Sequence, residues 1–309
     1  MKQLYTALIL ACTILGCQGQ KPQHVELVTE LANDLKQNYI FEKEAKAMHD
    51  VLLANLEEGK YNDLVKEDLA EALHEDLRAV VNDKHLRIRY GNRRSAPSKF
   101  AGREIKSLPN GVGEVEILES NIGYLELTGF SNPNGSYRNM LVEKMKKLAT
   151  TKAVIFDLRN NGGGSPEAVR LLSSYLFPAG EAVHLNSLYY RNRDVKTDYY
   201  TYKTLEGPRI DKLPVYILTS DFTFSAGEEF CYNLLTLKRA TLVGETTGGG
   251  AHPVNFYNLP EGVVAIIPEG RAINPITQTN WEGVGVVPHH TVDEAEALDK
   301  ALSLIGEDL

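Results

Sequence analysis

Apolar residues recur at helical spacing through the first quarter of the chain. Leu27, Leu31 and Leu35 fall on one stripe, and further leucines repeat the pattern on both sides of Gly59. Residues three and four apart share one face of an α-helix. The pattern therefore predicts amphipathic helices across residues 24–81, in three segments.

After residue 83 the pattern changes, and short apolar stretches alternate with longer amphipathic ones. Strands are predicted at residues 86–90, 112–118, 122–127, 153–156, 213–218 and 241–243, and helices at 136–148, 166–175 and 226–237. Strands that alternate with helices of about ten residues are typical of βαβ units. The order therefore predicts an α/β fold with a covered, mostly parallel sheet.

The first seventeen residues have the features of an export signal. Lys2 gives a positive start and residues 4–15 are almost wholly apolar, a run shorter than the roughly 20 residues of a membrane span. Residues 14–17 are similar to a lipobox, in which Cys17 is acylated after cleavage and becomes the first residue of the mature chain. A plain signal peptide with an incidental cysteine is the alternative, and Cys12 leaves too short an apolar core to be the acylated residue.

Charge and cysteine content narrow the possible partners. The net charge is −8 and no basic tract occurs, which argues against nucleic acid as a partner. Cys12 and Cys17 belong to the leader, so Cys231 is the single cysteine of the mature chain and no internal disulfide is expected. No histidine and cysteine cluster has zinc spacing, so we expect neither a metal nor a cofactor.

Three glycine- or serine-containing loops follow apolar strands, where α/β enzymes place their ligands. The first, residues 157–165, contains Gly162, Gly163 and Gly164 between a predicted strand and a predicted helix. Glycines there let backbone N–H groups approach a negative charge. A phosphate-binding loop is the competing interpretation, although the lysine of a P-loop is absent, and a flexible turn is another.

Ser225 lies in the second loop, between a predicted strand and a predicted helix. The unpaired N–H groups and the dipole at a helix N-terminus favour an anion, which suits a nucleophile whose tetrahedral intermediate carries an oxyanion. The alternative is that Ser225 merely caps the helix, as serines often do. Taken alone, the loop favours the cap.

Two further segments complete the set of candidate motifs. Residues 243–252 form a third glycine-rich loop that follows a short strand and ends at His252, and residues 280–288 contain Glu282. A tyrosine-rich stretch between the loops either lines a substrate groove or forms an exposed hairpin with aromatic pairs across its strands. Its members are Tyr189, Tyr190, Tyr199, Tyr200 and Tyr202.

In this order, the motifs resemble those of the S41 serine peptidases, the group of the C-terminal processing peptidases and the tricorn core. They are most similar to the tricorn and interphotoreceptor retinoid-binding-like branch. The resemblance implies a crotonase/ClpP-like αβ core at residues 85–309, preceded by a helical module at 18–84 and a lipoprotein signal peptide at 1–17. The segment between Tyr90 and Asn121 is too short for the PDZ domain of the processing peptidases, which needs roughly 80–100 residues.

The resemblance also implies roles for individual residues. Ser225 matches the family's nucleophile, and the backbone N–H of Ala226, with one from the Gly162-Gly163 turn, matches the oxyanion hole. Losing one oxyanion donor typically lowers kcat by about 10²–10³-fold.

His85, in the motif Asp83-Lys84-His85, falls where the family places its general base, and Glu282 matches the carboxylate of the tricorn-like charge-relay set. Two positions depart from the family pattern. Gly250 stands where the processing peptidases have a lysine base, which argues against a Ser–Lys dyad. Lys84 replaces a serine that tricorn-like members often carry before the histidine.

The sequence thus predicts an exported serine-type peptidase that acts on a peptide or protein through an acyl-enzyme. A binding protein that has lost turnover, and an esterase or amidase that uses the same serine, are the alternatives. A lipid on Cys17 would anchor the chain in the cell envelope. The residue after Cys17 is not aspartate, which favours the outer membrane, with the chain facing the periplasm or the surface.

Overall fold

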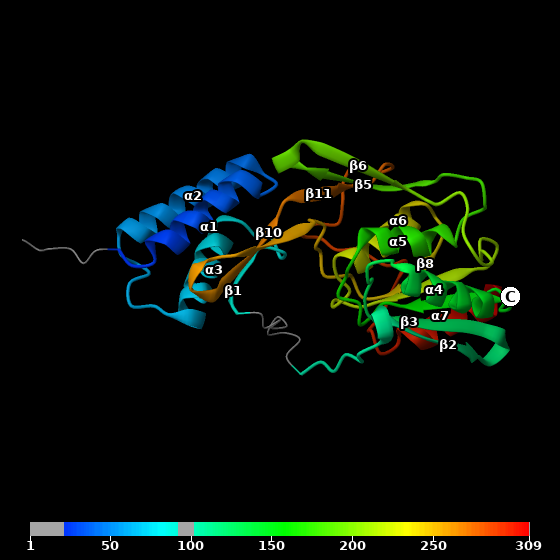
Figure 1. The fold of residues 1–309 in the computed structure, drawn as a ribbon. Coiled ribbons are helices and arrows are strands. Elements are labelled where there is room, and N and C mark those ends of the chain that lie inside the picture. Colours follow the sequence, from blue (N-terminus) through cyan, green and yellow to red (C-terminus); the bar gives the residue numbers. More distant parts are fainter. Residues whose placement is uncertain (1–21, 92–101, 309) are drawn as a thin grey trace, which may run out of the picture.

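The computed structural model describes residues 22–91 and 102–308. The predicted signal peptide and Cys17 lie outside these residues. No helix in the described part of the chain is long and apolar enough to cross a bilayer. Figure 1 shows the three N-terminal helices at one end of the molecule and a larger sheet with its covering helices at the other.

The N-terminal helices bury the predicted leucine stripe. They are α1 (Val25–Asn38), α2 (Glu42–Glu57) and α3 (Lys66–Val80). Leu27, Leu31 and Leu35 are fully buried, so the helical pattern of this region is confirmed. The break at Gly59 has a physical basis, because its φ of 74° lies in the left-handed region that favours glycine.

A small sheet from distant parts of the sequence packs against these helices. It has the order β1-β10-β9, is antiparallel, and consists of β1 (Arg87–Tyr90), β9 (Val254–Asn258) and β10 (Val263–Pro268). Its Ile88, Val263 and Ala265 join the leucines of the helices in one apolar cluster. The N-terminal helices are therefore covered by strands from both ends of the chain.

The larger sheet has six strands in the order β12-β8-β7-β4-β3-β2. All neighbours are parallel except the edge strand β2, which pairs antiparallel with β3. The strands are β2 (Val112–Leu118), β3 (Ile122–Leu127), β4 (Ala153–Asp157), β7 (Val215–Thr219), β8 (Thr241–Gly244) and β12 (His290–Thr291). The predicted α/β class with a mostly parallel sheet is confirmed.

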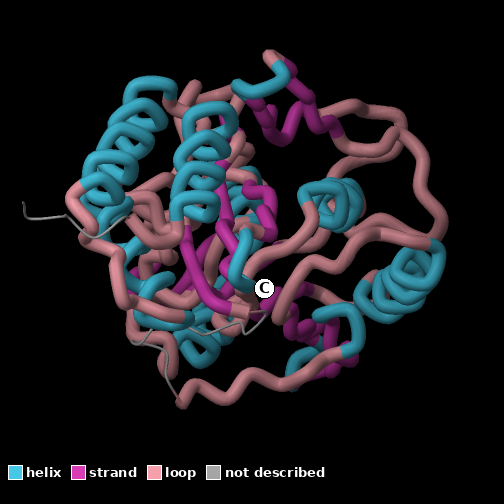
Figure 2. The backbone as a smooth tube through the Cα atoms, turned by 60° about the vertical axis from the view of Figure 1, so that its left-hand side comes forward, coloured by secondary structure: helices cyan, strands magenta, loops and turns pink. Residues whose placement is uncertain are grey.

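Helices cover both faces of this sheet. They are α4 (Gly135–Leu148), α5 (Pro166–Ser174) and α6 (Ala226–Thr236) on one face and α7 (Ala297–Asp308) on the other. Strand β4 shows why, because Val154 and Phe156 pack with the first group while Ala153 and Ile155 pack with α7. Figure 2 shows the strands running between helices on either side.

The tyrosine-rich stretch forms a hairpin. Strands β5 (His184–Tyr190) and β6 (Val195–Tyr200) pair antiparallel, and β11 (Gly270–Ile273) joins the other edge of β5. The rings of His184 and Tyr200 stack across the hairpin with centroids 4.4 Å apart. Of the two interpretations of this stretch, the structure supports the hairpin with aromatic pairs.

The hairpin turn also joins the core to the N-terminal helices. Arg191 donates hydrogen bonds from Nε to the carbonyl of Tyr39 at 2.7 Å, and from Nη2 to the carbonyls of Lys36 and Gln37 at 2.9 Å each. The last carbonyls of a helix have no partner within the helix. One side chain therefore satisfies the end of α1 and fixes it to the core.

We expect Arg191→Ala to lower the free energy of unfolding by about 1–3 kcal/mol, because it leaves carbonyls at the end of α1 without a protein donor. Urea unfolding followed by circular dichroism measures the change. The matched control is Arg193→Ala in the same turn, whose side chain is 57% exposed. A loss for Arg191→Ala no larger than for Arg193→Ala would contradict this role.

Candidate active site

The predicted loops converge at the carboxyl ends of β4, β7 and β8. Asn161 links the first two loops, because its carbonyl accepts the N–H of Phe224 at 2.9 Å and its Oδ1 accepts the N–H of Gly163 at 2.9 Å. Its Nδ2 donates to the carbonyl of Leu127 on β3. A fully buried amide thus holds the glycine turn beside the loop that carries Ser225.

Ser225 occupies an unusual backbone conformation at the start of α6. Its φ is 55° and its ψ is −119°, a region that residues with a Cβ rarely adopt. Conformations of this kind persist where surrounding contacts hold them, and they cluster at functional sites. Ser225 also forms a capping box with Glu228, so it caps α6 as well as occupying this strained conformation.

The predicted oxyanion donors lie beside Ser225, but they are not equally available. A Cβ added at Gly163 would lie 2.8 Å from the Cβ of Ser225 and 3.2 Å from the nitrogen of Ala226, so only glycine fits there. The N–H of Gly163 is already bonded to Asn161 Oδ1, and that of Gly162 points to the carbonyl of Thr128 at 3.4 Å. Among the described residues, the N–H of Ala226 has no acceptor.

Glu228 joins the Ser225 turn to the third loop, residues 243–252, through hydrogen bonds. Its carboxylate accepts the N–H groups of Ser225, Gly249 and Gly250 at 2.9, 2.6 and 2.8 Å, and the hydroxyl of Thr247 at 2.5 Å. Burial raises the pKa of Glu228 to about 7, although these hydrogen bonds favour the charged form. No sequence signal singles out Glu228, since a glutamate three residues after a serine is common at helix starts.

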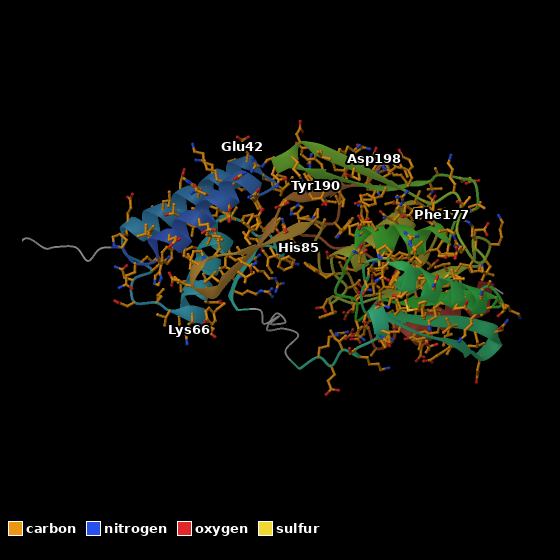
Figure 3. All side chains as sticks on the ribbon, in the orientation of Figure 1. Glu42, Lys66, His85, Phe177, Tyr190 and Asp198 are labelled. Carbon is orange, nitrogen blue, oxygen red and sulfur yellow. The ribbon has the colours of Figure 1, made fainter. Side chains whose placement is uncertain are left out.

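His85 lies between the N-terminal helices and the core (Figure 3). Its ring packs against that of Phe224, the residue before Ser225, with centroids 4.6 Å apart. A Cβ at Gly250 would lie 2.2 Å from the Phe224 ring and 2.7 Å from His85 Cε1, so the glycine makes room for both rings. The described structure contains no hydrogen bond between the Ser225 hydroxyl and His85.

The His85 ring is in its neutral form near pH 7. Burial lowers the pKa of His85 to about 4, and the charge of Asp83 opposes the shift. The Nδ1 atom is buried and has no hydrogen-bond partner among the described residues. A neutral imidazole with a free nitrogen can accept a proton.

Glu282 is brought to the same cluster. Its Oε2 accepts the N–H of Ala251 at 2.6 Å, whereas its Oε1 is buried without a partner in the described part of the chain. Ligand atoms of Asp83, His85 and Glu282 lie within 4.8 Å of one another. Burial raises the pKa of Glu282, and the charge of His252 acts in the opposite direction.

Asp83 and His252 are two further members that the motif comparison did not assign. Asp83 Oδ2 is 2.7 Å from His252 Nδ1, and Asp83 Oδ1 accepts the N–H of His85 at 2.9 Å. The hydroxyl of Tyr39 donates to Asp83 Oδ2 at 3.2 Å, and the ring of Phe41 meets His252 edge-on. Both oxygens of Asp83 are engaged, so we do not assign a metal to this cluster.

One sequence signal pointed toward these two residues. Asp83 begins the motif that contains His85, and His252 ends the third loop, which contains Gly250. The contribution of Tyr39 has no such signal, because it depends on how α1 and α2 pack against the core. Lys84, the departure from the family pattern, reaches across the site and donates to the carbonyl of Gly248.

The chain is similar to known peptidases. The chain is 28% identical over 182 residues to the chloroplastic carboxyl-terminal-processing peptidase 2 of Arabidopsis thaliana, covering 58% of this chain and 33% of that protein. It is 28% identical over 207 residues to the tricorn protease of Thermoplasma volcanium, covering 63% and 18%. The chain thus spans a third or less of these two curated relatives.

The fold matches a solved structure of a candidate peptidase from Parabacteroides merdae, with a TM-score of 0.65 and 20% identity over 90% of this chain and 95% of that one. A model of the N-terminal domain of this peptidase family in eukaryotic IRBP matches residues 5–123. The model described as peptidase family S41 matches residues 121–292, more than half of the chain. The chain therefore belongs to peptidase family S41.

Proposed function

We propose that this protein is an exported serine-type peptidase that hydrolyses peptide bonds through an acyl-enzyme on Ser225. The observation that carries the proposal is the backbone of Ser225, held in a strained conformation at the start of α6. Beside it lies the N–H of Ala226, which has no acceptor among the described residues. Strain at a functional turn needs support, and the hydrogen bond from the Ser225 N–H to Glu228 supplies it.

The proposed reaction begins with the Ser225 hydroxyl. Its oxygen attacks the carbonyl carbon of the peptide bond, and its proton passes to His85. The tetrahedral oxyanion faces the N–H of Ala226 at the positive end of α6. His85 then gives the proton to the leaving amine, and water hydrolyses the acyl-enzyme by the same route in reverse.

Glu282 stabilises the imidazolium that forms on His85. Within the described part of the chain, His85 Nδ1 and Glu282 Oε1 are both buried without partners, in a cluster whose ligand atoms lie within 4.8 Å of one another. Catalytic hydrogen bonds are often long before substrate binds and shorten in the complex. We therefore assign Glu282 as the direct partner of His85, with no bridging residue in place of the family's serine.

A binding protein on the same fold is the second candidate, favoured by Lys84 at the position of that serine. In the structure Lys84 does not block the cluster, since its side chain is exposed and its amine reaches the carbonyl of Gly248. This contact favours the peptidase. An esterase or amidase would use the same serine and differ only in the bond that is cleaved.

We also propose that a lipid on Cys17 anchors the protein in the cell envelope, at the outer membrane. Residues 14–17 resemble a lipobox, and the described part of the chain has no helix that could span the bilayer. Two acyl signals on one cysteine would suffice for stable anchoring.

We expect the purified protein to react covalently with a fluorophosphonate probe, because the probe traps serines activated by a base. Ser225→Ala should abolish labelling, and His85→Ala should slow it by about 10⁴-fold or more, as removal of a base from such sites does. Gel fluorescence against time measures both. Ser303→Ala, an exposed serine on α7, is the control and should label as the wild type does. A folded wild type that never labels would favour the binding protein.

We expect Cys17→Ser to move the protein from the membrane to the soluble fraction of the cell envelope and to remove incorporation of labelled palmitate. The substitution takes away the thiol that lipidation requires, and Cys12→Ser should leave both readouts unchanged. Palmitate incorporation that persists in Cys17→Ser would exclude the assigned site.

A further inference from the structure

His252 lies between two carboxylates of the candidate site. Its Nδ1 is 2.7 Å from Asp83 Oδ2 and 3.6 Å from Glu282 Oε2. The side chains of His252 and Asp83 are 3% and 2% exposed, and that of Glu282 is 18% exposed. The histidine is therefore held between two acids with almost no water around it.

Two carboxylates this close and this buried repel each other. Charges in such an environment interact more strongly than in water, and a buried carboxylate without a compensating charge takes up a proton instead. A protonated Glu282 would be a weaker acceptor and would have no negative charge to stabilise the imidazolium of His85. The proposed reaction therefore needs a positive charge near Asp83 and Glu282.

The other charged and titratable groups around the cluster meet this need less well. The charge of Lys84 lowers the pKa of Glu282 less than that of His252 does, and Lys84 is exposed with its amine bonded to a backbone carbonyl. Arg271 is also exposed. Tyr39 is neutral and donates one hydrogen bond to Asp83, while Glu44 adds negative charge near Tyr39. His85 must stay neutral to act as a base. His252 is the one group left that can be both cationic and buried here, among the described residues.

We propose that His252 is a positioning residue of the active site, whose imidazolium lies between Asp83 and Glu282 and keeps Glu282 ionised as the partner of His85. This inference rests on the proposed peptidase function. It adds a member from the third loop to the acid–base set, and it gives Asp83 a role as the group that keeps His252 charged.

The directions of the titrations agree with this arrangement. Burial works against the charged form of His252, but the hydrogen bond and charge of Asp83, with the charge of Glu282, raise the pKa of His252 overall. Burial also opposes the charged form of Asp83, yet its bonds and charges with His252 and His85 lower the pKa of Asp83 overall. Both shifts favour the ionic form of the pair, and the positive charge of His252 lowers the pKa of Glu282 from the value that burial alone would give.

The test is the rate of fluorophosphonate labelling from pH 5 to pH 9 in the wild type and in His252→Asn. Asparagine keeps a donor near Asp83 and removes the charge. The pKa of Glu282 should then rise, so the fall in labelling rate on the acid side of the profile should begin about one pH unit higher. At pH 6 the variant should therefore be labelled about tenfold more slowly than the wild type. Labelling at pH 9 should stay within about threefold of the wild type.

A double variant separates charge from packing. Asp83→Asn together with His252→Asn removes both the repelling carboxylate and its cation, so the acid limb should return toward the wild-type position. His49→Asn is the matched control, because His49 forms a similar pair with Asp50 on the surface of α2. An equal loss of rate at every pH in His252→Asn, or no recovery in the double variant, would reduce His252 to a packing role and overturn the proposal.

Nuclear magnetic resonance titration of the histidine rings gives a readout that needs no activity. The His252 signal, assigned by its loss in His252→Asn, should show an imidazolium at pH 7 and a lower pKa in Asp83→Asn. A neutral His252 at pH 6 overturns the inference whatever the labelling shows. Absent labelling with a charged His252 would instead disprove the peptidase function, and with it the role of His252 in catalysis, while the ion pair would stand.

Discussion

One buried carboxylate determines how the site is assembled. Glu228 accepts four hydrogen bonds, from the turn that carries Ser225 and from the loop that follows β8. Glu228 thereby joins the start of α6 to the loops that follow β7 and β8. The same carboxylate supports the strained backbone of Ser225. The pairing of the parallel sheet brings these loops to one edge, and Glu228 sets their spacing there.

Two features of the site follow from this assembly. Gly250 is held where any side chain would collide with both Phe224 and His85, so the third loop leaves room for the His85 ring. The glycine turn is held by Asn161, which accepts the N–H of Gly163, whereas the N–H of Ala226 has no acceptor among the described residues. On the proposed mechanism, the oxyanion role therefore falls first on Ala226.

The sequence was most informative where the pattern was local. The leucine stripe of α1 and the apolar runs of β4 and β7 predicted helices and strands because their periodicity reflects burial on one face or on both. Strands β9, β10 and β11 were not predicted. β10 and β11 pair with β1 and β5 across long stretches of chain, and β9 joins this arrangement only through β10. The motifs located Ser225, His85 and Glu282, and the structure brings His85 and Glu282 into one cluster. They could not reveal Glu228 or Tyr39, whose contacts exist only after distant segments have packed.

Two contacts make the candidate site depend on the packing of the N-terminal helices during folding. Tyr39 bonds to Asp83, and the ring of Phe41 packs against His252. The acid–base cluster is closed on one side by the joint between α1 and α2, while its other members come from loops as late as residue 282. On the proposed mechanism, a chain that has not yet docked its first two helices leaves the Asp83–His252 pair open to water. On the same mechanism, the acid–base cluster would be complete only after the N-terminal helices have packed against the core.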